Sequence, residues 1–263
     1  MVTPTPLHPN SSKGEPTLRN SIPPAEWQAR VDLAAAYRHA QYAGWNDSIF
    51  NHITLRVPGE PDHFLIKPHE LLFEEVTASS LLKLDMEGRP IGEDKPINPA
   101  ATTIHTAVLM ARSDINAVMH VHTEPGIAIS AVKGGLKYFC QDAMNFYNRI
   151  GYHDFEGIAT DSDECARLAR DLGQNNHSVI LRNHGLLTTG ANISRAVTTM
   201  AMLIRVADAQ LRLMAAGADI IEPKPEVCEH TAKQFDKQRN SGGQVEWAAI
   251  LRNLDRLDPS FRD

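Results

Sequence analysis

Two apolar stretches that both carry histidine near their ends constrain this chain more than any other feature. INAVMHVHT (115–123) is a continuous apolar strand in which His120 and His122 are two residues apart. Alternate side chains on a strand project from the same face, so the two imidazoles point the same way. HSVILRNHGLL (177–187) is a second buried strand, which runs into a loop carrying His184. Three imidazoles from two strands can hold a metal ion with open positions, although each can instead make a hydrogen bond in the core.

Length and composition exclude several classes of protein. The chain has 263 residues, of which 42% are hydrophobic, enough for one sizeable core. No apolar run approaches the ~18 residues needed to span a membrane. A net charge of −6 argues against nucleic acid as the main partner. The N-terminus lacks the pattern of a secretory signal, and three scattered cysteines fit a reducing environment, so we expect a cytoplasmic protein.

The predicted organisation is a flexible N-terminal arm (1–24) followed by a single domain (25–263) with a polar C-terminal segment. The arm is rich in Pro, Ser and Thr, whereas helices and strands alternate after it. The longest helix has a stripe of Met and Leu that suggests an oligomer interface. The predicted helices are 25–44, 98–112, 125–135, 162–173, 192–217 and a short piece at 244–254. The predicted strands are 52–57 and 63–68 in a hairpin, 115–123 and 177–187, and 77–85 is a short helix or turn.

The order of these motifs resembles the class II aldolase/adducin family over roughly residues 25–220. Asn51 precedes the hairpin, His105 stands fifteen positions before His120, and 62 positions separate His122 from His184. The block QDAMNFYNRIGYHDFEGIA resembles the adducin-like bacterial branch. The resemblance implies a three-layer α/β/α fold around a central, mainly antiparallel sheet, usually as a homotetramer. It also implies a divalent metal, most often Zn²⁺ with Fe²⁺ or Mn²⁺ as alternatives, held by His120, His122 and His184.

The sequence departs from the sugar-phosphate aldolases of that family at the residues that act on a sugar phosphate. Ala101 stands where those enzymes carry a glutamate that transfers protons. Pro99 and Ala100 replace two serines that help bind phosphate in those enzymes. A Thr-Gly pair that also binds phosphate in those enzymes corresponds to positions near His69 and Glu70 here. Phosphate binding needs backbone N–H groups, hydroxyls or cations at close range. We therefore expect a small, unphosphorylated hydroxy-keto or keto acid as substrate.

Several polar residues are candidates for the missing roles, and each has a structural alternative. A proton-transfer residue must have a suitably placed and tuned side chain. The candidates for it are Glu70, Glu124, Tyr152 and His153, with Asp154 placed to orient His153. Glu124 can instead satisfy a helix N-terminus, and Tyr152 and His153 can simply pack. The candidates for substrate binding are Asn51, Lys67, His105 and Arg182. His105 also fits a supporting role beside the site, and Lys67 and Arg182 can instead be ordinary surface or strand-edge charges.

These observations favour a metal-dependent aldolase or lyase in which the metal stabilises an enolate. Retro-aldol cleavage, decarboxylation and epimerisation all fit that chemistry. One alternative is a mononuclear non-haem iron oxygenase, because three imidazoles suit iron as well as zinc and the adducin-like branch includes such enzymes. The other is a non-catalytic scaffold like the adducin head. Adducins have lost the metal-binding histidines that this chain retains.

Overall fold

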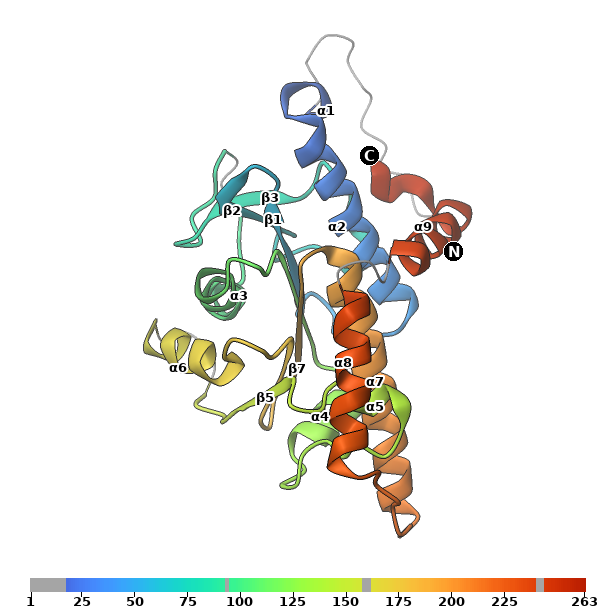
Figure 1. Cartoon of the computed structure of the whole chain (residues 1–263). Coiled ribbons are helices and arrows are strands. Elements are labelled where there is room, and N and C mark those ends of the chain that lie inside the picture. Colours follow the sequence, from blue (N-terminus) through green and yellow to red (C-terminus); the bar gives the residue numbers. More distant parts are fainter. Residues whose placement is uncertain (1–17, 93–94, 158–161, 240–243) are drawn as a thin grey trace, which may run out of the picture.

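A seven-stranded sheet forms the centre of the computed structural model, which describes residues 18–92, 95–157, 162–239 and 244–263 (Figure 1). The strand order is β3-β2-β1-β4-β7-β6-β5, and only the β5–β6 pair is parallel. The sheet is therefore mainly antiparallel. The strands are β1 (His52–Val57), β2 (Glu60–Ile66), β3 (Leu82–Asp85), β4 (Ala117–Val121), β5 (Ile150–His153), β6 (Ser178–Leu181) and β7 (Gly185–Gly190).

Helices cover both faces of the sheet and make the three layers of an α/β/α fold. Figure 1 shows α3 and α6 on one face and α2, α4, α5 and α7 on the other, with α8 and α9 outside. The helices are α1 (Leu18–Ser21), α2 (Pro24–Tyr42), α3 (Pro99–Ala111), α4 (Glu124–Ser130), α5 (Gln141–Met144), α6 (Ser162–Leu172), α7 (Ile193–Ala215), α8 (Pro225–Arg239) and α9 (Gln244–Leu257), with 3-10 turns η1 (Phe73–Glu75) and η2 (Pro259–Arg262). The predicted fold class is confirmed.

The alternation of side chains along β4 explains how one strand serves both the core and a polar site. Ala117, Met119 and Val121 pack into the apolar cluster formed with α2 and α7. Val118 belongs to the cluster on the opposite face, with α3 and α6. Since alternate residues share a face, His120 projects on the side of Val118, toward α3. All five residues of this strand are buried.

Most elements with a clear hydrophobic period fall where the sequence predicts them. The hairpin, α2, α3, α4, α6 and α7 are confirmed, with Asn98 and Asn192 capping α3 and α7. The prediction of a helix or turn for 77–85 is wrong in its second half, because that half pairs with β2 as β3. The prediction of one strand over 177–187 is wrong, because this segment forms two antiparallel strands, β6 and β7, joined by the turn that carries His184. The sequence also does not predict the short strand β5 and the polar helix α8. The conformation of β5 and of α8 depends on contacts with neighbouring elements more than on the local sequence pattern.

Arg38, near the end of α2, is buried although it is charged. The residue is only 6% exposed. Its guanidinium donates to Val76 O at 3.0 Å and to Asp258 Oδ2 at 2.6 Å. A buried arginine is tolerated when its donors are paired in this way. Arg38 thus ties α2 to the C-terminal turn η2.

The N-terminal arm falls largely outside the described residues, which begin at residue 18. Leu18–Ser21 forms the short helix α1, so this end of the predicted arm is helical. The exposed apolar face expected on α7 is also smaller than predicted, because only Met214 among its large apolar side chains is clearly exposed, at 44%. In the part of the chain that the structure describes, every helix is too short or too polar to cross a membrane.

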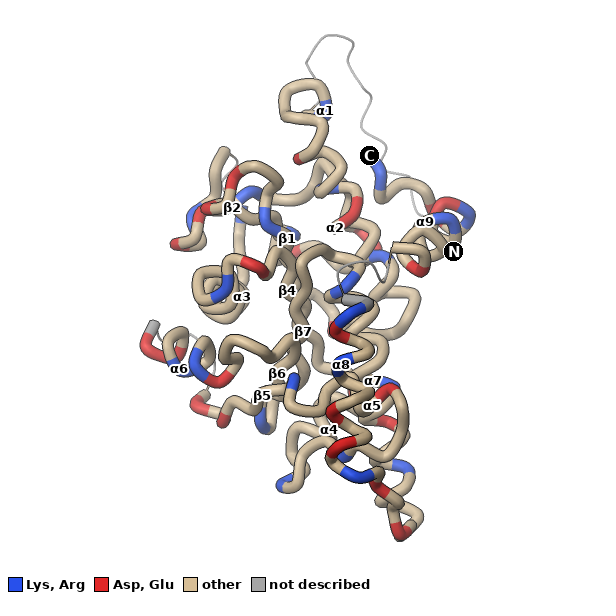
Figure 2. The backbone as a smooth tube through the Cα atoms, viewed as in Figure 1, with Lys and Arg blue, Asp and Glu red and all other residues tan. Residues whose placement is uncertain are grey.

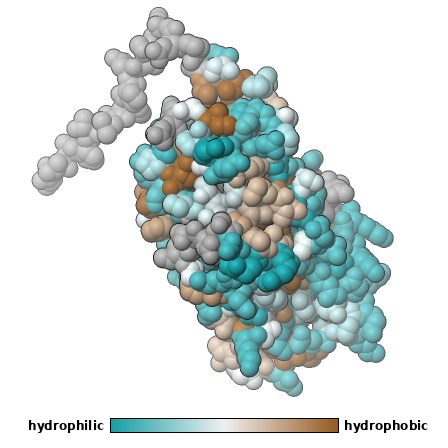
Figure 3. Space-filling model, turned by 90° about the vertical axis from the view of Figure 1, so that its left-hand side faces the viewer, coloured by the Kyte–Doolittle hydropathy of each residue, from teal (hydrophilic) through white to brown (hydrophobic). Residues whose placement is uncertain are grey.

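Charged and apolar side chains are distributed as expected for helices packed around a buried sheet. Figure 2 shows acidic and basic residues mixed along the outer helices, whereas β4 and β7 carry neither. Figure 3 shows the side of the molecule that lies on the left in Figure 1, where hydrophilic residues surround scattered apolar ones. The charges of opposite sign lie interleaved, which fits the mildly acidic net charge.

Candidate metal centre

The three histidines singled out in the sequence meet at one edge of the central strands. His120 lies at the end of β4, His122 directly follows this strand, and His184 directly precedes β7. Because β4 and β7 are antiparallel neighbours, the end of one strand lies beside the start of the other. The Nε2 atom of His122 is 2.8 Å from that of His120 and 2.9 Å from that of His184.

Gly185 allows β7 to begin this close to the histidines of β4. A Cβ atom at this position would lie 2.7 Å from Val121 O and 3.2 Å from His122 Cδ2. Contacts below about 3 Å are not tolerated without a shift of the backbone. The glycine after His184 is therefore required by the close approach of two strands, beyond the tight bend expected from the sequence.

Hydrogen bonds to the outer ring nitrogens fix the orientation of two of the three imidazoles. His120 Nδ1 lies 3.0 Å from Leu186 O, and His122 Nδ1 lies 3.0 Å from Asp47 Oδ2. A carbonyl or carboxylate oxygen only accepts, so Nδ1 carries the proton in each ring and Nε2 is left with a lone pair. Second-sphere bonds of this kind orient histidine ligands in metal sites.

The convergence of these lone pairs fits a divalent cation. Neutral imidazole rings whose unprotonated nitrogens face one another repel, unless a positive charge lies between them. Nitrogens bound tetrahedrally to zinc at about 2.0–2.1 Å would be roughly 3.3 Å apart, so the rings would move apart by about half an ångström from the 2.8 and 2.9 Å seen here. Among the described residues, His120, His122 and His184 form the group whose ligand atoms all lie within 4.8 Å of one another.

Burial favours the neutral imidazole of His120 and of His184, the state that binds metal. It lowers the pKa of His120 well below its usual value, and repulsion from the neighbouring histidines adds to this effect. The pKa of His184 is lowered to about 4, again mainly by burial, with a smaller contribution from His122. Metal binding therefore needs no deprotonation of these two rings near neutral pH.

A second pair of histidines supports the centre from the α3 side. His52 is opposite His120 in the β1–β4 register, and their ring centroids are 5.2 Å apart. His52 Nδ1 lies 2.9 Å from His105 Nε2, and the hydroxyl of Thr54 lies 2.7 Å from His105 Nδ1. His105 is fully buried. A substrate would not reach it, so we replace its predicted substrate contact by a supporting role.

Two hollows adjoin the three histidines on different sides. One is lined by His122 together with Asp47, Glu124 and residues of α7. The other is lined by His184 together with His153, Arg182 and residues of α6. The hollow beside His122 is open to solvent, whereas the one beside His184 is too small to admit a substrate, and both contain titratable side chains.

The candidates for proton transfer lie in four different surroundings. Glu124 is exposed at the start of α4 and lines the hollow beside His122. Glu70 is exposed in the turn after β2 and lines neither hollow. Tyr152 packs against the cluster of the opposite sheet face, where its hydroxyl accepts from Leu136 N at 3.0 Å. His153, next in the chain, is buried on the α6 side. Only Glu124 and His153 share a hollow with the triad.

Asn51 and Lys67, both predicted to bind substrate, are buried beside the loops that lead to the site. Asn51 has a φ of 65°, a conformation that asparagine tolerates, and its Nδ2 donates to Trp45 O. Its Oδ1 is buried and has no partner among the described residues. Lys67 Nζ instead lies within 3.3 Å of four backbone carbonyls. Its donors are committed, and we replace its predicted substrate role by loop anchoring.

Two carboxylates near the site could not be found from the sequence. Asp47 bonds to His122, a residue 75 positions later in the chain. His153 Nδ1 lies 2.8 Å from Asp171 Oδ2, so the partner of His153 is on α6 and the suggested Asp154, which is exposed, is not. Sequence spacing carried no signal for either contact, since both depend on how separate elements pack.

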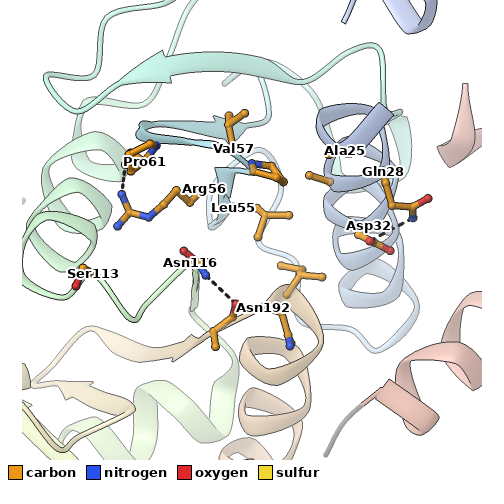
Figure 4. A pocket seen from close by; sticks show the side chains of 15 residues that line it. Ala25, Gln28, Asp32, Leu55, Arg56, Val57, Pro61, Ser113, Asn116 and Asn192 are labelled. Atoms are coloured by element: carbon orange, nitrogen blue, oxygen red, sulfur yellow. Dashed lines mark hydrogen bonds between the residues drawn. The ribbon is translucent and has the colours of Figure 1, made fainter. Parts of the chain in front are cut away.

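A further pocket lies at the opposite end of β1 and β4 (Figure 4). It is enclosed by the start of α2, the β1–β2 turn and the start of α7. Arg56 points across it to the carbonyl of Pro61, and Gln28 bonds to Asp32 on the same helix. Its lining lacks histidine. It is therefore not part of the metal centre.

The fold and the convergent histidines define the class of metal-binding α/β/α proteins to which the aldolases of class II belong. The sequence pattern described as Class II Aldolase and Adducin N-terminal domain matches residues 31–211. The chain therefore belongs to the class II aldolase and adducin family.

Three relatives show the breadth of this family. The aldolase II superfamily protein of Pseudomonas syringae is 40% identical, with a TM-score of 0.88 over 94% of this chain and 100% of that one. The L-fuculose 1-phosphate aldolase of Glaciozyma antarctica PI12 is 28% identical, with a TM-score of 0.80 over 90% and 93% of the two chains. Alpha-adducin of Rattus norvegicus is 34% identical over 98% of this chain, which spans 36% of that protein.

Proposed function

We propose that this protein is a metal-dependent lyase that acts on a small, unphosphorylated hydroxy-keto or keto acid. The observation that carries the proposal is the convergence of three imidazole Nε2 atoms, two of them with their outer nitrogens committed to Leu186 O and Asp47. When bound there, a divalent metal such as Zn²⁺ supplies the positive charge that stabilises an enolate. Membership of the class II aldolase and adducin family supports this reaction type.

The residues around the centre would contribute orientation and shielding. His120, His122 and His184 would hold the cation, and His52 would pack behind His120. Phe155, whose ring centroid is 6.4 Å from that of His184, would cover one side of the centre. These groups suit a small polar substrate with hydroxyl and carbonyl oxygens.

The start of α3 supports an unphosphorylated substrate. The N–H of Ala100 already binds the capping side chain of Asn98 at 3.0 Å. The hydroxyls of Thr102 and Thr103 both donate to Pro99 O. The donors of this helix end are thus used within the chain, although anions commonly bind at such ends when the donors are free. Because a relative is named L-fuculose 1-phosphate aldolase, that sugar phosphate is the first compound to test against the proposal.

The metal centre is tested by metal analysis of the protein as purified and after loading with Zn²⁺, Fe²⁺ or Mn²⁺. We expect about one ion per chain in the wild type and none in the His120→Ala/His122→Ala double variant. His177→Gln is the control, because this histidine is also buried but bonds to Ser178 and Asn145 away from the centre. Equal metal content in the wild type and the double variant would refute the site.

The reaction is tested with the loaded protein on a panel of hydroxy-keto acids, keto acids and sugar phosphates. We expect cleavage or decarboxylation of an unphosphorylated acid, followed by detection of the carbonyl products. Preferential turnover of a ketose phosphate would overturn the substrate class while keeping the lyase. Oxygen uptake with Fe²⁺, without cleavage under anaerobic conditions, would favour the oxygenase instead.

We further propose a homo-oligomer, with a tetramer as the state usual in this family. Phe155, beside His184, is 54% exposed, and two further large apolar side chains are exposed, Phe50 (48%) and Ile127 (46%). Such groups are commonly covered in an assembly. Light scattering coupled to size exclusion gives the mass directly, and a pure monomer at micromolar concentration would contradict this proposal.

A further inference from the structure

We propose that His153 is a positioning residue for the proposed metal centre, and that it acts through one buried water molecule held between its Nε2 and the Nδ1 of His184. This inference rests on the proposed function, because it takes His184 to be a metal ligand. It assigns the outer contact that orients the third imidazole of the centre. His153 touches neither substrate nor metal in this role.

The outer nitrogen of His184 differs from those of the other two proposed ligands. His120 Nδ1 is bonded to Leu186 O, and His122 Nδ1 is bonded to Asp47. His184 Nε2 faces His122 Nε2, whereas its Nδ1 has no hydrogen-bond partner among the described residues. A histidine that binds a metal almost always donates its other ring N–H to an acceptor. The third ligand therefore requires an acceptor on the side of Nδ1.

The pairing of β5 with β6 brings a second imidazole beside His184. His153 is the last residue of β5 and is paired with Leu181, three residues before His184. His153 and His184 line the same hollow. Burial is the main cause of the lowered pKa of His184, and repulsion from His122 and from His153 adds to it. The rings of His153 and His184 are therefore neighbours across this hollow.

Gly151 lets α6 approach β5 closely enough to hold His153 in one tautomer. A Cβ at Gly151 would be 2.2 Å from Asp171 O, a separation that no side chain tolerates. The Asp171 carboxylate then reaches His153 Nδ1 at 2.8 Å. A carboxylate only accepts, so Nδ1 carries the proton and the lone pair of the neutral ring is on Nε2. His153 thus presents an acceptor.

The surroundings of His153 Nε2 point to a bridging molecule. The residue is only 4% exposed, and this nitrogen is buried without a hydrogen-bond partner among the described residues. Buried polar atoms without a partner are uncommon. The carboxylate oxygen Oε1 of Glu164 is 3.6 Å away, too far for a direct hydrogen bond. Two polar groups at such a distance are commonly bridged by water.

The size of the hollow fits a single water molecule. Its interior is about 10 Å³, which is roughly the space that one buried water occupies and far less than a substrate needs. The polar members of its wall include His153, Glu164 and His184. A buried water is held only where polar groups meet in this way. The apolar part of the wall is formed by Ile104, Leu168 and Leu181.

The proposed water would make three hydrogen bonds, the number usual for a buried water. Its oxygen would accept the Nδ1 proton of His184. Its two hydrogens would be donated to His153 Nε2 and toward Glu164 Oε1. The Arg182 guanidinium does not compete for these positions, because it donates to Val132 O at 2.7 Å. Each polar atom of the hollow thereby gains a partner of the correct kind.

This chain of hydrogen bonds would do for His184 what Asp47 does for His122. Asp171 fixes the tautomer of His153, and His153 in turn fixes the water. The water then holds the proton of His184 on Nδ1 and leaves the lone pair on Nε2, the nitrogen that faces the centre. Contacts of this kind orient a ligand and raise its affinity for metal.

A high-resolution crystal structure of the wild type tests the water directly, with or without bound metal. We expect a water at about 2.7–3.2 Å from both His153 Nε2 and His184 Nδ1. In His153→Gln the side-chain oxygen can still accept, so the water should remain, whereas His153→Leu should lack it. A dry hollow in the wild type, or Glu164 bonded directly to His153 Nε2, would overturn the inference.

Chelator competition with Zn²⁺ measures the effect of His153 on the centre. We expect the affinity to fall by about 10- to 100-fold in His153→Leu, the usual cost of losing an outer contact, and to be largely recovered in His153→Gln. His177→Leu is the matched control, because this buried histidine bonds to Ser178 and Asn145 away from the centre. Equal affinities in His153→Leu and His177→Leu would overturn the role, and so would equal losses in His153→Leu and His153→Gln.

The two experiments separate this inference from the proposed function. Wild type that binds no metal would refute the proposed metal centre, and the crystal structure would then still decide whether a water joins the two rings. Metal binding without that water would refute the present inference alone. Proton NMR of the zinc-loaded protein adds a signature that packing does not change: the Nδ1–H of His184 should be visible in the wild type and in His177→Leu and lost to exchange in His153→Leu.

Discussion

The carboxylate of Asp47 lies 3.0 Å from Nδ1 of His122 and fixes the imidazole that bridges the other two. Asp47 belongs to the loop that follows α2, so the candidate metal centre is assembled from three separate parts of the chain. The proton of Nδ1 is held by this carboxylate, and the lone pair of Nε2 is thereby aimed at its neighbours. Outer contacts of this kind raise the basicity of the ring as well as orient it.

Replacing Asp47 by alanine should weaken metal binding by 10- to 100-fold, the usual cost of losing an outer-shell carboxylate. The measurement is a chelator competition with Zn²⁺ at neutral pH. Asp208→Asn is the matched control, since this carboxylate lines the same hollow but pairs with Arg212. Equal affinity in Asp47→Ala and Asp208→Asn would show that the contact does not orient a ligand.

A methyl group at Gly185 should disturb the candidate metal centre, although Gly185 itself is not a proposed ligand. Gly185→Ala places a Cβ against Val121 O and His122 Cδ2, and overpacking of this kind costs about 1–3 kcal/mol of folding free energy. We expect a lower free energy of unfolding in urea together with weaker metal binding. Gly134→Ala is the control, because a Cβ there meets nothing within 4 Å. Equal effects of the two substitutions would contradict this account of the strand approach.

The fold was predictable where a segment carries its own period and its own end signals. Asn98 and Pro99 mark the start of α3, and Gly44 with a φ of 70° marks the end of α2. By contrast, β3 and β5 are strands of only four residues, too short for their own pattern to decide their conformation. Their conformation is decided by hydrogen bonds to β2 and β6. Tertiary pairing of this kind outweighs local propensity.

The sequence predicted which histidines belong to the candidate site, but not the carboxylates that form hydrogen bonds to them. The spacing of His120 and His122 fixes their common face, because the period of a strand is two. No such rule joins Asp171 to His153 or Asp47 to His122, since helix packing and loop paths set these distances. Lys67 is the opposite case, a residue that the sequence suggested for the site but that the fold uses elsewhere. Its charge suggested a substrate contact, but the surrounding carbonyls of the folded chain use all of its donors.

Lys67→Met should destabilise the protein by removing the cation that binds the carbonyls of Ile49 and Leu71 at 2.8 and 2.9 Å. Buried carbonyls left without a donor cost on the order of 1–3 kcal/mol each to the free energy of unfolding. Urea unfolding at pH 7 measures this loss. Lys137→Met, which removes an exposed pair with Glu222, should cost no more than about 1 kcal/mol. If both variants were equally stable, the anchoring role of Lys67 would be refuted.

The buried His105 should make the protein less stable in mild acid. Burial lowers the pKa of His105 to about 3, whereas the unfolded chain binds a proton below its ordinary value of about 6.5. The unfolded state therefore binds more protons as the pH falls from about 6.5 to 3, and stability is lost over this window by up to ~1.4 kcal/mol per pH unit. Above pH 6.5 both states are neutral and the effect is constant.

Substituting His105 by glutamine should flatten this pH dependence, even though it also removes bonds to His52 and Thr54. Urea unfolding of metal-free protein at pH 7, 6 and 5 gives the slope of the unfolding free energy against pH. We expect a shallower slope in His105→Gln than in wild type, because one buried group that resists protonation is gone. His230→Gln on α8 removes an exposed histidine and should leave the slope unchanged. An unchanged slope in His105→Gln would mean that the ring is accessible to protons in the folded state.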